Sequence, residues 1–159
     1  MVHHEPVTYD LRRATEADRE FLWRLHALAM RGPVERTWGW DENFQRGYFE
    51  EHFDPAKQRI VVVDGQDVGG LQTERRTDSL YLSKVEILPS FQGQGLGTRI
   101  VQDLLAEARA QGLPVTLQVL KEHPRARRWY EQLGFVVTGE TEISYLMSTA
   151  DASEGSSLG

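Results

Sequence analysis

The feature that most constrains this chain is a glycine-rich run, Gln92-Gly93-Gln94-Gly95-Leu96-Gly97, between a strand pattern and a helix pattern. Residues 80–88 before it are typical of a strand that Pro89 ends, and apolar residues recur every four positions from Leu96 to Ala108 after it. Free N–H groups and the positive end of the helix dipole face outward at such a junction, where glycine lets an anion approach the backbone. The run therefore predicts a phosphate-binding turn, although turns and helix starts also collect glycine without binding a ligand.

Two common phosphate-binding motifs are excluded by the residues around this turn. No Lys-Ser or Lys-Thr pair follows the glycines, so the run is not a P-loop. A dinucleotide fingerprint would need glycine where the chain has Thr98. It would also need an acidic residue about 20 positions further on, where residues 116–118 carry none.

A second stretch also combines a strand with a helix. Residues 117–120 are typical of a short strand, and residues 124–135 predict a helix that Gly134 ends. The buried face of this helix is expected to consist of Ala126, Trp129, Tyr130 and Leu133.

Together, Q-x-x-G-x-G at Gln92 to Gly97 and A-x-x-x-Y-x-x-x-G-F at Ala126 to Phe135 resemble the two cofactor motifs of the GNAT superfamily of acyl-CoA N-acyltransferases. The resemblance covers Leu80 to Phe135 in the family's order and spacing, and implies acetyl-CoA as cosubstrate. The expected order of elements is strand, two helices, three strands, helix, strand, helix and two strands. We therefore expect an α/β fold: a single GNAT-like domain whose mixed, mostly antiparallel central sheet is flanked by helices.

The resemblance also implies a cofactor site. It places the pantetheine arm along the central strand and the pyrophosphate on the glycine turn. His123 stands where the family usually has asparagine, so it is expected either to contact pantetheine or to position Tyr130, and the role of the asparagine is not carried over to it. The expected cofactor-binding residues are Val85, Glu86, Ile87, Gln92, Gly93, Gln94, Gly95, Leu96, Gly97, Thr98, His123 and Tyr130.

Direct acyl transfer needs a base for the attacking amine and a proton for the departing thiolate. Tyr130 matches the family tyrosine that protonates the sulfur; the alternative is a tyrosine that only packs in the core. Glu86 is the first candidate for the base. Strand alternation places Glu86 on one face with Leu82 and Lys84, so a surface pair with Lys84 is the alternative, and a bulge would change its direction.

Two further positions bear on the base. Glu35 is the reserve candidate. Some GNAT enzymes keep a glutamate on the next strand, where this chain has Gln118, whose amide cannot accept the proton.

Residues 34–53 are polar but rich in aromatic residues, and in GNAT enzymes this region determines acceptor specificity. We expect Glu35, Trp38 and Trp40 to bind the substrate, because indole faces and carboxylates attract an ammonium group. The alternative is that the two tryptophans only pack a loop onto the sheet.

The N-terminal helix is expected to end at Gly32-Pro33, because proline breaks a helix interior. His26 on that helix is interpreted as a packed or capping histidine. The pair His3-His4, with no third ligand in view, is interpreted as a loose terminus and not as a metal site.

Composition bounds the remaining possibilities. The chain has 159 residues, of which 40% are hydrophobic and 26% charged, and a net charge of −6. We expect one domain at residues 1–149 and a disordered tail at 150–159. Without cysteine, disulfides and thiolate zinc sites are excluded, and we expect no metal. The net negative charge argues against nucleic-acid binding. No signal peptide or membrane-spanning run is recognised, so we expect a cytoplasmic protein. We expect it to be a monomer or a homodimer.

These observations predict an N-acetyltransferase that moves an acetyl group from acetyl-CoA to a primary amine of a small molecule by direct attack in a ternary complex. The acidic charge mildly favours a cationic acceptor. Two alternatives stay open: a protein or peptide N-acetyltransferase acting on an N-terminus or a lysine, and a non-catalytic acyl-CoA-binding regulator.

Overall fold

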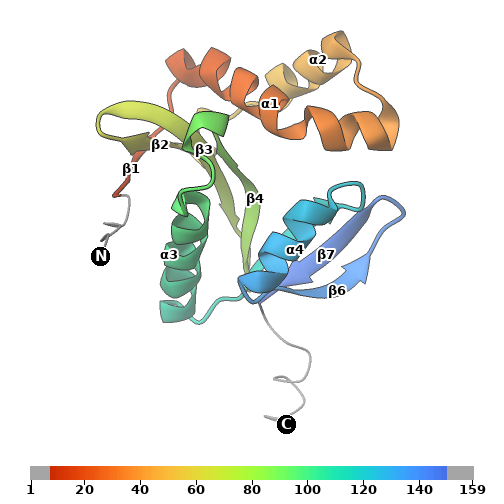
Figure 1. The fold of residues 1–159 in the computed structure, drawn as a ribbon. Coiled ribbons are helices and arrows are strands. Elements are labelled where there is room, and N and C mark those ends of the chain that lie inside the picture. Colours follow the sequence, from red (N-terminus) through yellow and green to blue (C-terminus); the bar gives the residue numbers. More distant parts are fainter. Residues whose placement is uncertain (1–7, 150–159) are drawn as a thin grey trace, which may run out of the picture.

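The computed structural model describes residues 8–149, so the predictions for His3-His4 and for the tail lie outside the described residues (Figure 1). The helices are α1 (Arg19–Trp38), α2 (Glu42–His52), α3 (Leu96–Ala110) and α4 (Pro124–Gln132). The strands are β1 (Asp10–Arg13), β2 (Gln58–Val63), β3 (Gln66–Arg75), β4 (Leu80–Ile87), β5 (Val115–Leu120), β6 (Val136–Glu140) and β7 (Ser144–Ser148).

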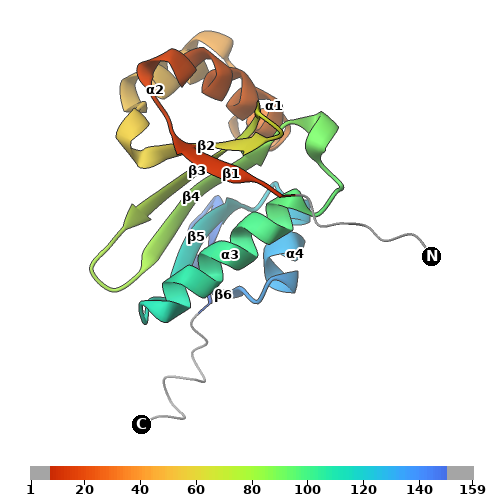
Figure 2. The same cartoon turned by 90° about the vertical axis from the view of Figure 1, so that its left-hand side faces the viewer.

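The strands form one sheet in the order β1-β2-β3-β4-β5-β7-β6, with β4 in the centre. Every neighbouring pair is antiparallel except β4 and β5. Helices α1 and α2 lie together at one end of the molecule, while α3 and α4 lie together nearer the other (Figures 1 and 2). The expected α/β fold with a mixed, mostly antiparallel sheet is confirmed.

Two apolar cores follow from strand alternation. On β2, Val61 and Val63 belong to the larger core, which contains the buried face of α3; Ile60 and Val62 belong to the smaller core with α1 and α2. All four residues expected on the inner face of α4 pack against the larger core. The sheet therefore separates an α3–α4 side from an α1–α2 side.

The parallel pairing of β4 with β5 is short. Only Leu80 with Val115 and Tyr81 with Thr116 are paired, although both strands continue beyond them. From Leu82 to Ile87, β4 therefore has no strand partner on its β5 side among the described residues. Backbone groups on this free edge are available to a ligand that lies along it.

A bulge in β4 corrects the predicted alternation. Gln72 pairs with Lys84 and Thr73 with Leu82, so Ser83 is an extra residue without a partner. Leu82 consequently lies in the larger core, whereas Lys84 approaches Phe49 of the smaller core. The prediction that Leu82 shares a face with Glu86 is wrong, because a bulge reverses the alternation.

The predicted end of the first helix is also wrong. Helix α1 continues through Pro33 and ends at Trp38, where Gly39 follows with φ +84°. Proline removes one helical hydrogen bond, but Pro33 and Val34 are both buried here, and this burial offsets the loss. The extra turns carry the end of α1 across to the connection between β5 and α4.

Candidate active site

The glycine turn has the geometry of an anion site. Gly93 and Gly95 both have φ +79°, a left-handed conformation that favours glycine, and the space beside each is open. Among residues 8–149, no backbone carbonyl accepts from the N–H groups of residues 93–98. The amide of Gln92 braces the turn, since its Nε2 donates to the carbonyl oxygen of Ile87 at 2.9 Å. Free N–H groups at the start of α3 are a suitable cradle for the phosphates of a coenzyme.

The two predicted cofactor stretches lie next to each other. Trp129 on α4 donates its Nε1–H to Oγ1 of Thr98, in the first turn of α3, at 3.0 Å. Tyr130, the next residue, packs against Trp129 and Phe135 with ring centroids 4.8 and 5.5 Å away. Helix α4 is thereby fixed beside the glycine turn.

Tyr130 is half-buried, and its hydroxyl makes no hydrogen bond with any residue in the described part of the chain. Burial raises the pKa of Tyr130 well above its usual value, and the charge of Glu86 raises it further. Tyr130 on α4 and Glu86 on β4 are therefore close enough to interact electrostatically. With no partner among the described residues, this hydroxyl is available to a ligand.

Glu86 is held by a residue that the sequence did not single out for the site. Nδ1 of His26 lies 3.0 Å from Oε2 of Glu86, and the two side chains are only 18% and 10% exposed. Because an ionised carboxylate only accepts, Nδ1 carries the hydrogen. His26 is packed, as expected, between Trp23 and Phe49. Glu86 therefore pairs with His26, and the alternative of a surface pair with Lys84 does not form.

The expected substrate-binding residues lie at the end of α1 and just beyond it. Trp40 stacks on Trp23 with ring centroids 6.2 Å apart and donates Nε1–H to Glu42 at 2.6 Å. Trp38 is 60% exposed, and Glu35 is exposed as well. The structure thus makes Trp40 a partly packed residue and leaves Trp38 and Glu35 on the surface.

The end of α1 is tied to the other half of the sheet. Both Nε and a terminal nitrogen of Arg36 donate to the carbonyl oxygen of Glu122, at 3.1 and 2.7 Å. His123, the residue before α4, lies beside this contact. Burial lowers the pKa of His123, and the charges of Arg36 and Arg125 lower it further.

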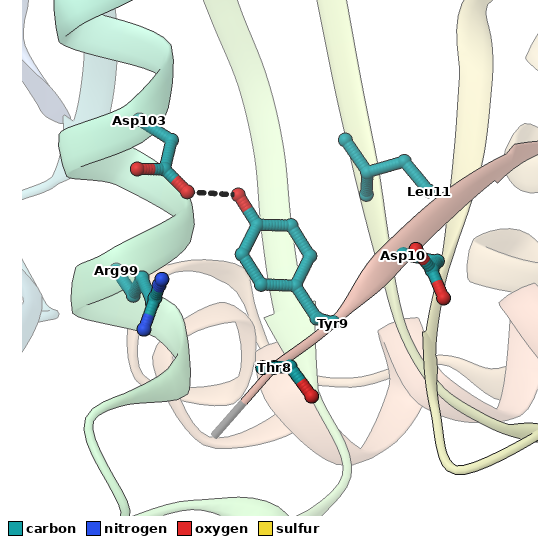
Figure 3. A pocket seen from close by; sticks show the side chains of 6 residues that line it. All are labelled: Thr8, Tyr9, Asp10, Leu11, Arg99 and Asp103. Carbon is teal, nitrogen blue, oxygen red and sulfur yellow. Dashed lines mark hydrogen bonds between the residues drawn. The ribbon is translucent and has the colours of Figure 1, made fainter. Parts of the chain in front are cut away.

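A separate pocket of about 370 Å³ lies between β1 and α3 (Figure 3). Tyr9 crosses it and donates its hydroxyl hydrogen to Asp103 at 2.5 Å, and burial, followed by Asp103, raises the pKa of Tyr9 to about 12. None of the expected site residues lines it. It is lined by Thr8, Tyr9, Asp10, Leu11, Arg99 and Asp103.

Within residues 8–149, no group of three or more histidine, aspartate or glutamate side chains is arranged to hold a metal ion. None of the helices described is both long and apolar enough to span a membrane.

The fold agrees with the comparisons to known proteins. The model of the Acetyltransferase (GNAT) family matches residues 19–135, and the chain belongs to this family. An uncharacterized N-acetyltransferase of Mycobacterium tuberculosis is 32% identical over 103 residues, which cover 62% of this chain and 66% of that protein, just under two thirds.

Two further proteins are similar over most of the chain. Peptidyl-lysine N-acetyltransferase YjaB of Salmonella typhimurium is 31% identical over 143 residues, 86% of this chain and 90% of that protein. The crystal structure of PaiA N-acetyltransferase from Thermoplasma acidophilum in complex with coenzyme A has a TM-score of 0.70 at 14% identity, covering 91% of this chain and 99% of that one.

Proposed function

We propose that this protein transfers the acetyl group of acetyl-CoA to the primary amine of a small molecule, by direct attack in a ternary complex. The observation that carries the proposal is geometric: Glu86 lies on the free-edge stretch of β4, and α4, which carries Tyr130, is fixed beside the glycine turn. Glu86 and Tyr130 would then act as base and acid on a thioester lying along that edge.

Binding of acetyl-CoA would use backbone groups. The N–H groups of residues 93–98 would hold the pyrophosphate, and the free edge at Val85, Glu86 and Ile87 would pair with pantetheine. An N–H on this edge would donate to the thioester oxygen and stabilise the negative charge that develops on it. His123 would lie near pantetheine at the start of α4.

In the reaction, the amine nitrogen attacks the thioester carbon, a C–N bond forms and the C–S bond breaks. Glu86 takes the proton from the attacking nitrogen, and Tyr130 gives its hydroxyl proton to the departing sulfur. His26 is a positioning residue, because its hydrogen bond fixes the direction of the Glu86 carboxylate.

The electrostatic link between the two groups gives these steps an order. The negative charge of Glu86 raises the pKa of Tyr130. Once Glu86 has accepted the amine proton, that charge is gone and Tyr130 becomes a stronger acid. Proton donation to the sulfur is therefore favoured after the amine has lost its proton.

The acceptor would enter on the α1–α2 side of β4, where Glu86 points toward His26. Glu35, Trp38 and Trp40 would form the outer wall of this entry. Trp38→Ala should then raise the KM of the acceptor with little change in the KM of acetyl-CoA, since it removes binding shared by ground and transition states.

The experiment that tests the proposal is an acetyl-CoA thiol-release assay over a panel of small amines, polyamines, aminoglycosides, amino acids and peptides. We expect turnover with a small amine, and loss of most of it in Glu86→Gln. Retained coenzyme A binding with no turnover on any acceptor would favour the non-catalytic regulator instead.

Acetylation of peptide lysine is the second candidate, because the relative YjaB carries that activity in its name. The structure offers one observation in its favour. Trp38, Phe44 and Tyr48 are 60%, 65% and 56% exposed at the end of α1 and on α2, a surface on which a peptide could rest. A higher kcat/KM for lysine peptides than for every free amine in the panel would decide for this candidate.

A further inference from the structure

Lys84 lies on the same side of β4 as Glu86. Its Nζ is 5.4 Å from the ring centroid of Phe49 on α2. Phe49 stacks on His26 at 6.2 Å, and His26 holds Glu86. We call these four residues, Lys84, Phe49, His26 and Glu86, the acceptor cluster.

The side chain of Lys84 is half-buried, and its ammonium group makes no ion pair with any residue in the range 8–149. By contrast, Arg12, Arg19 and Arg46 each pair with two carboxylates. Burial lowers the pKa of Lys84, and the charge of Glu86 opposes this.

A half-buried cation without a paired carboxylate is unfavourable, because the charge loses part of its water and gains little in return. The face of Phe49 supplies a weak attraction. Lys121 shows the ordinary arrangement, since it pairs with Glu140 at 2.6 Å. An anion bound beside Lys84 would supply the missing partner.

The position of Lys84 on β4 indicates what kind of molecule would supply this anion. Lys84 and Glu86 are two residues apart, and the bulge at Ser83 precedes both, so the alternation between them is regular. Their Cα atoms are about 7 Å apart along the strand. A short molecule with its amine at Glu86 would place a group a few bonds away beside Lys84.

We propose that Lys84 forms an anion subsite within the acceptor site, so that the preferred acceptor is a small amine carrying a carboxylate or a phosphate a few bonds from its nitrogen. This inference rests on the proposed function, because it takes Glu86 as the group that receives the amine. It also departs from the expectation of a cationic acceptor, since the net charge of −6 belongs to the whole chain and not to this cluster.

The test compares amines that differ only in charge: β-alanine with β-alaninamide, phenylalanine with phenylalaninamide, and O-phosphoethanolamine with ethanolamine. Each is assayed with the wild type, Lys84→Met and Lys84→Arg, at pH values that give both members of a pair the same fraction of neutral amine. At least one anionic amine should exceed its neutral partner in kcat/KM by about tenfold or more. The first two pairs report a carboxylate and the third a phosphate.

In Lys84→Met, the ratio of kcat/KM for the anionic amine to kcat/KM for its neutral partner should fall toward one. This fall should come from a higher KM of the anionic amine, with the KM of acetyl-CoA unchanged. Lys84→Arg should keep part of the ratio. Lys57→Met, which removes an exposed lysine charge, should leave it unchanged. A folded Lys84→Met that keeps the full ratio, or a wild type that prefers the neutral member of every pair, would overturn the inference.

A binding measurement separates this inference from the proposed function. The same amines are titrated into the wild type and Lys84→Met in the presence of coenzyme A, where no transfer occurs. Binding of an anionic amine that Lys84→Met loses supports the subsite even if no thiol is released. Turnover of neutral amines alone, with no binding of any anionic amine, overturns the subsite and leaves the acetyltransferase proposal standing.

Discussion

At the scale of single residues, the hydroxyl of Tyr130 is the most informative group in the site. It has no protein partner in the described chain, although the half-buried ring packs against the larger core. Packing alone explains the ring but not the free hydroxyl, whereas proton donation to sulfur needs both. The core-residue interpretation and the general-acid interpretation therefore make different predictions for the hydroxyl alone.

Tyr130→Phe keeps the ring and removes the hydroxyl. We expect turnover to fall by about 10²–10⁴-fold, the usual range for general-acid catalysis, with little change in the KM of acetyl-CoA. Steady-state kinetics together with single-turnover experiments would measure this. Wild-type turnover in the variant, where chemistry limits the rate, would return Tyr130 to the core-residue interpretation.

Glu86→Gln tests the role of Glu86 as the base. Turnover should be lowered most at low pH, where the amine is mostly protonated and a base is most needed. The pH–rate profiles of the wild type and the variant would measure this. An equal fall in turnover at every pH would mean that Glu86 does not take the proton from the amine.

At the scale of elements, the turn before α3 carries the cofactor proposal, and its two left-handed glycines are the positions that matter. Gly95 is the residue before the first turn of α3, and a side chain there would project into the open space beside the N–H groups. Gly112, just after α3, has a similar φ of +73° and equally open surroundings. It offers a matched control for the strain of a side chain at positive φ.

We expect coenzyme A to raise the Tm of the wild type, because a ligand that binds only the native state stabilises it. Gly95→Asp should abolish this rise by placing a carboxylate against the phosphates. Gly112→Asp should lower the Tm of the free protein to a similar degree and keep the rise. If Gly95→Asp responds to coenzyme A like the control, the glycine turn does not hold the phosphates.

The elements near this turn could be predicted from the sequence because they depend on local residue spacing. The turn, the apolar face of α3 and the face of α4 all follow from local spacing, and the structure has each of them where the sequence indicated. The roles assigned to Glu35, Trp38 and Trp40 remain predictions. The pairing of His26 with Glu86 joins residues 60 positions apart, and only the packing of α1 on β4 brings them together.

The two wrong predictions have a common origin in tertiary structure. Helix α1 continues through Pro33 because the buried surface around it outweighs the local preference to stop. The bulge at Ser83 is set by the pairing of β4 with β3, which no pattern in β4 alone reveals. The face on which Lys84 and Glu86 lie could be argued only once that pairing was known.

At the scale of the whole molecule, the sheet that residues 8–149 form consists of two halves, and between β4 and β5 these halves meet at only two residue pairs. Side-chain contacts from the helices add to this junction. Trp129 joins α4 to α3 on one side, and Arg36 joins the end of α1 to Glu122 on the other. The arginine contact thereby holds the acceptor side of the molecule against the start of α4, where His123 lies.

The last prediction uses His123 to report on this contact. Burial is the main cause of the lowered pKa of His123, and the charge of Arg36 is the second. Arg36→Ala should therefore raise the pKa of His123, but leave it below the usual value of about 6.5 because burial remains. Arg24→Ala, which removes an exposed charge elsewhere on α1, should leave it unchanged.

A histidine titration by NMR, with His123→Asn to assign the signal, would measure these values. The sign of the stability effect follows from the same shift. A histidine whose native pKa is depressed favours the folded state above its unfolded pKa, and this contribution is lost as the pH falls through the native pKa. The wild type should thus lose stability below about pH 6.5, and Arg36→Ala should lose less over that interval. Equal pKa values of His123 in the wild type and Arg36→Ala would show that the end of α1 does not lie beside His123 in solution. The two halves of the sheet would then be joined without the contact between Arg36 and Glu122.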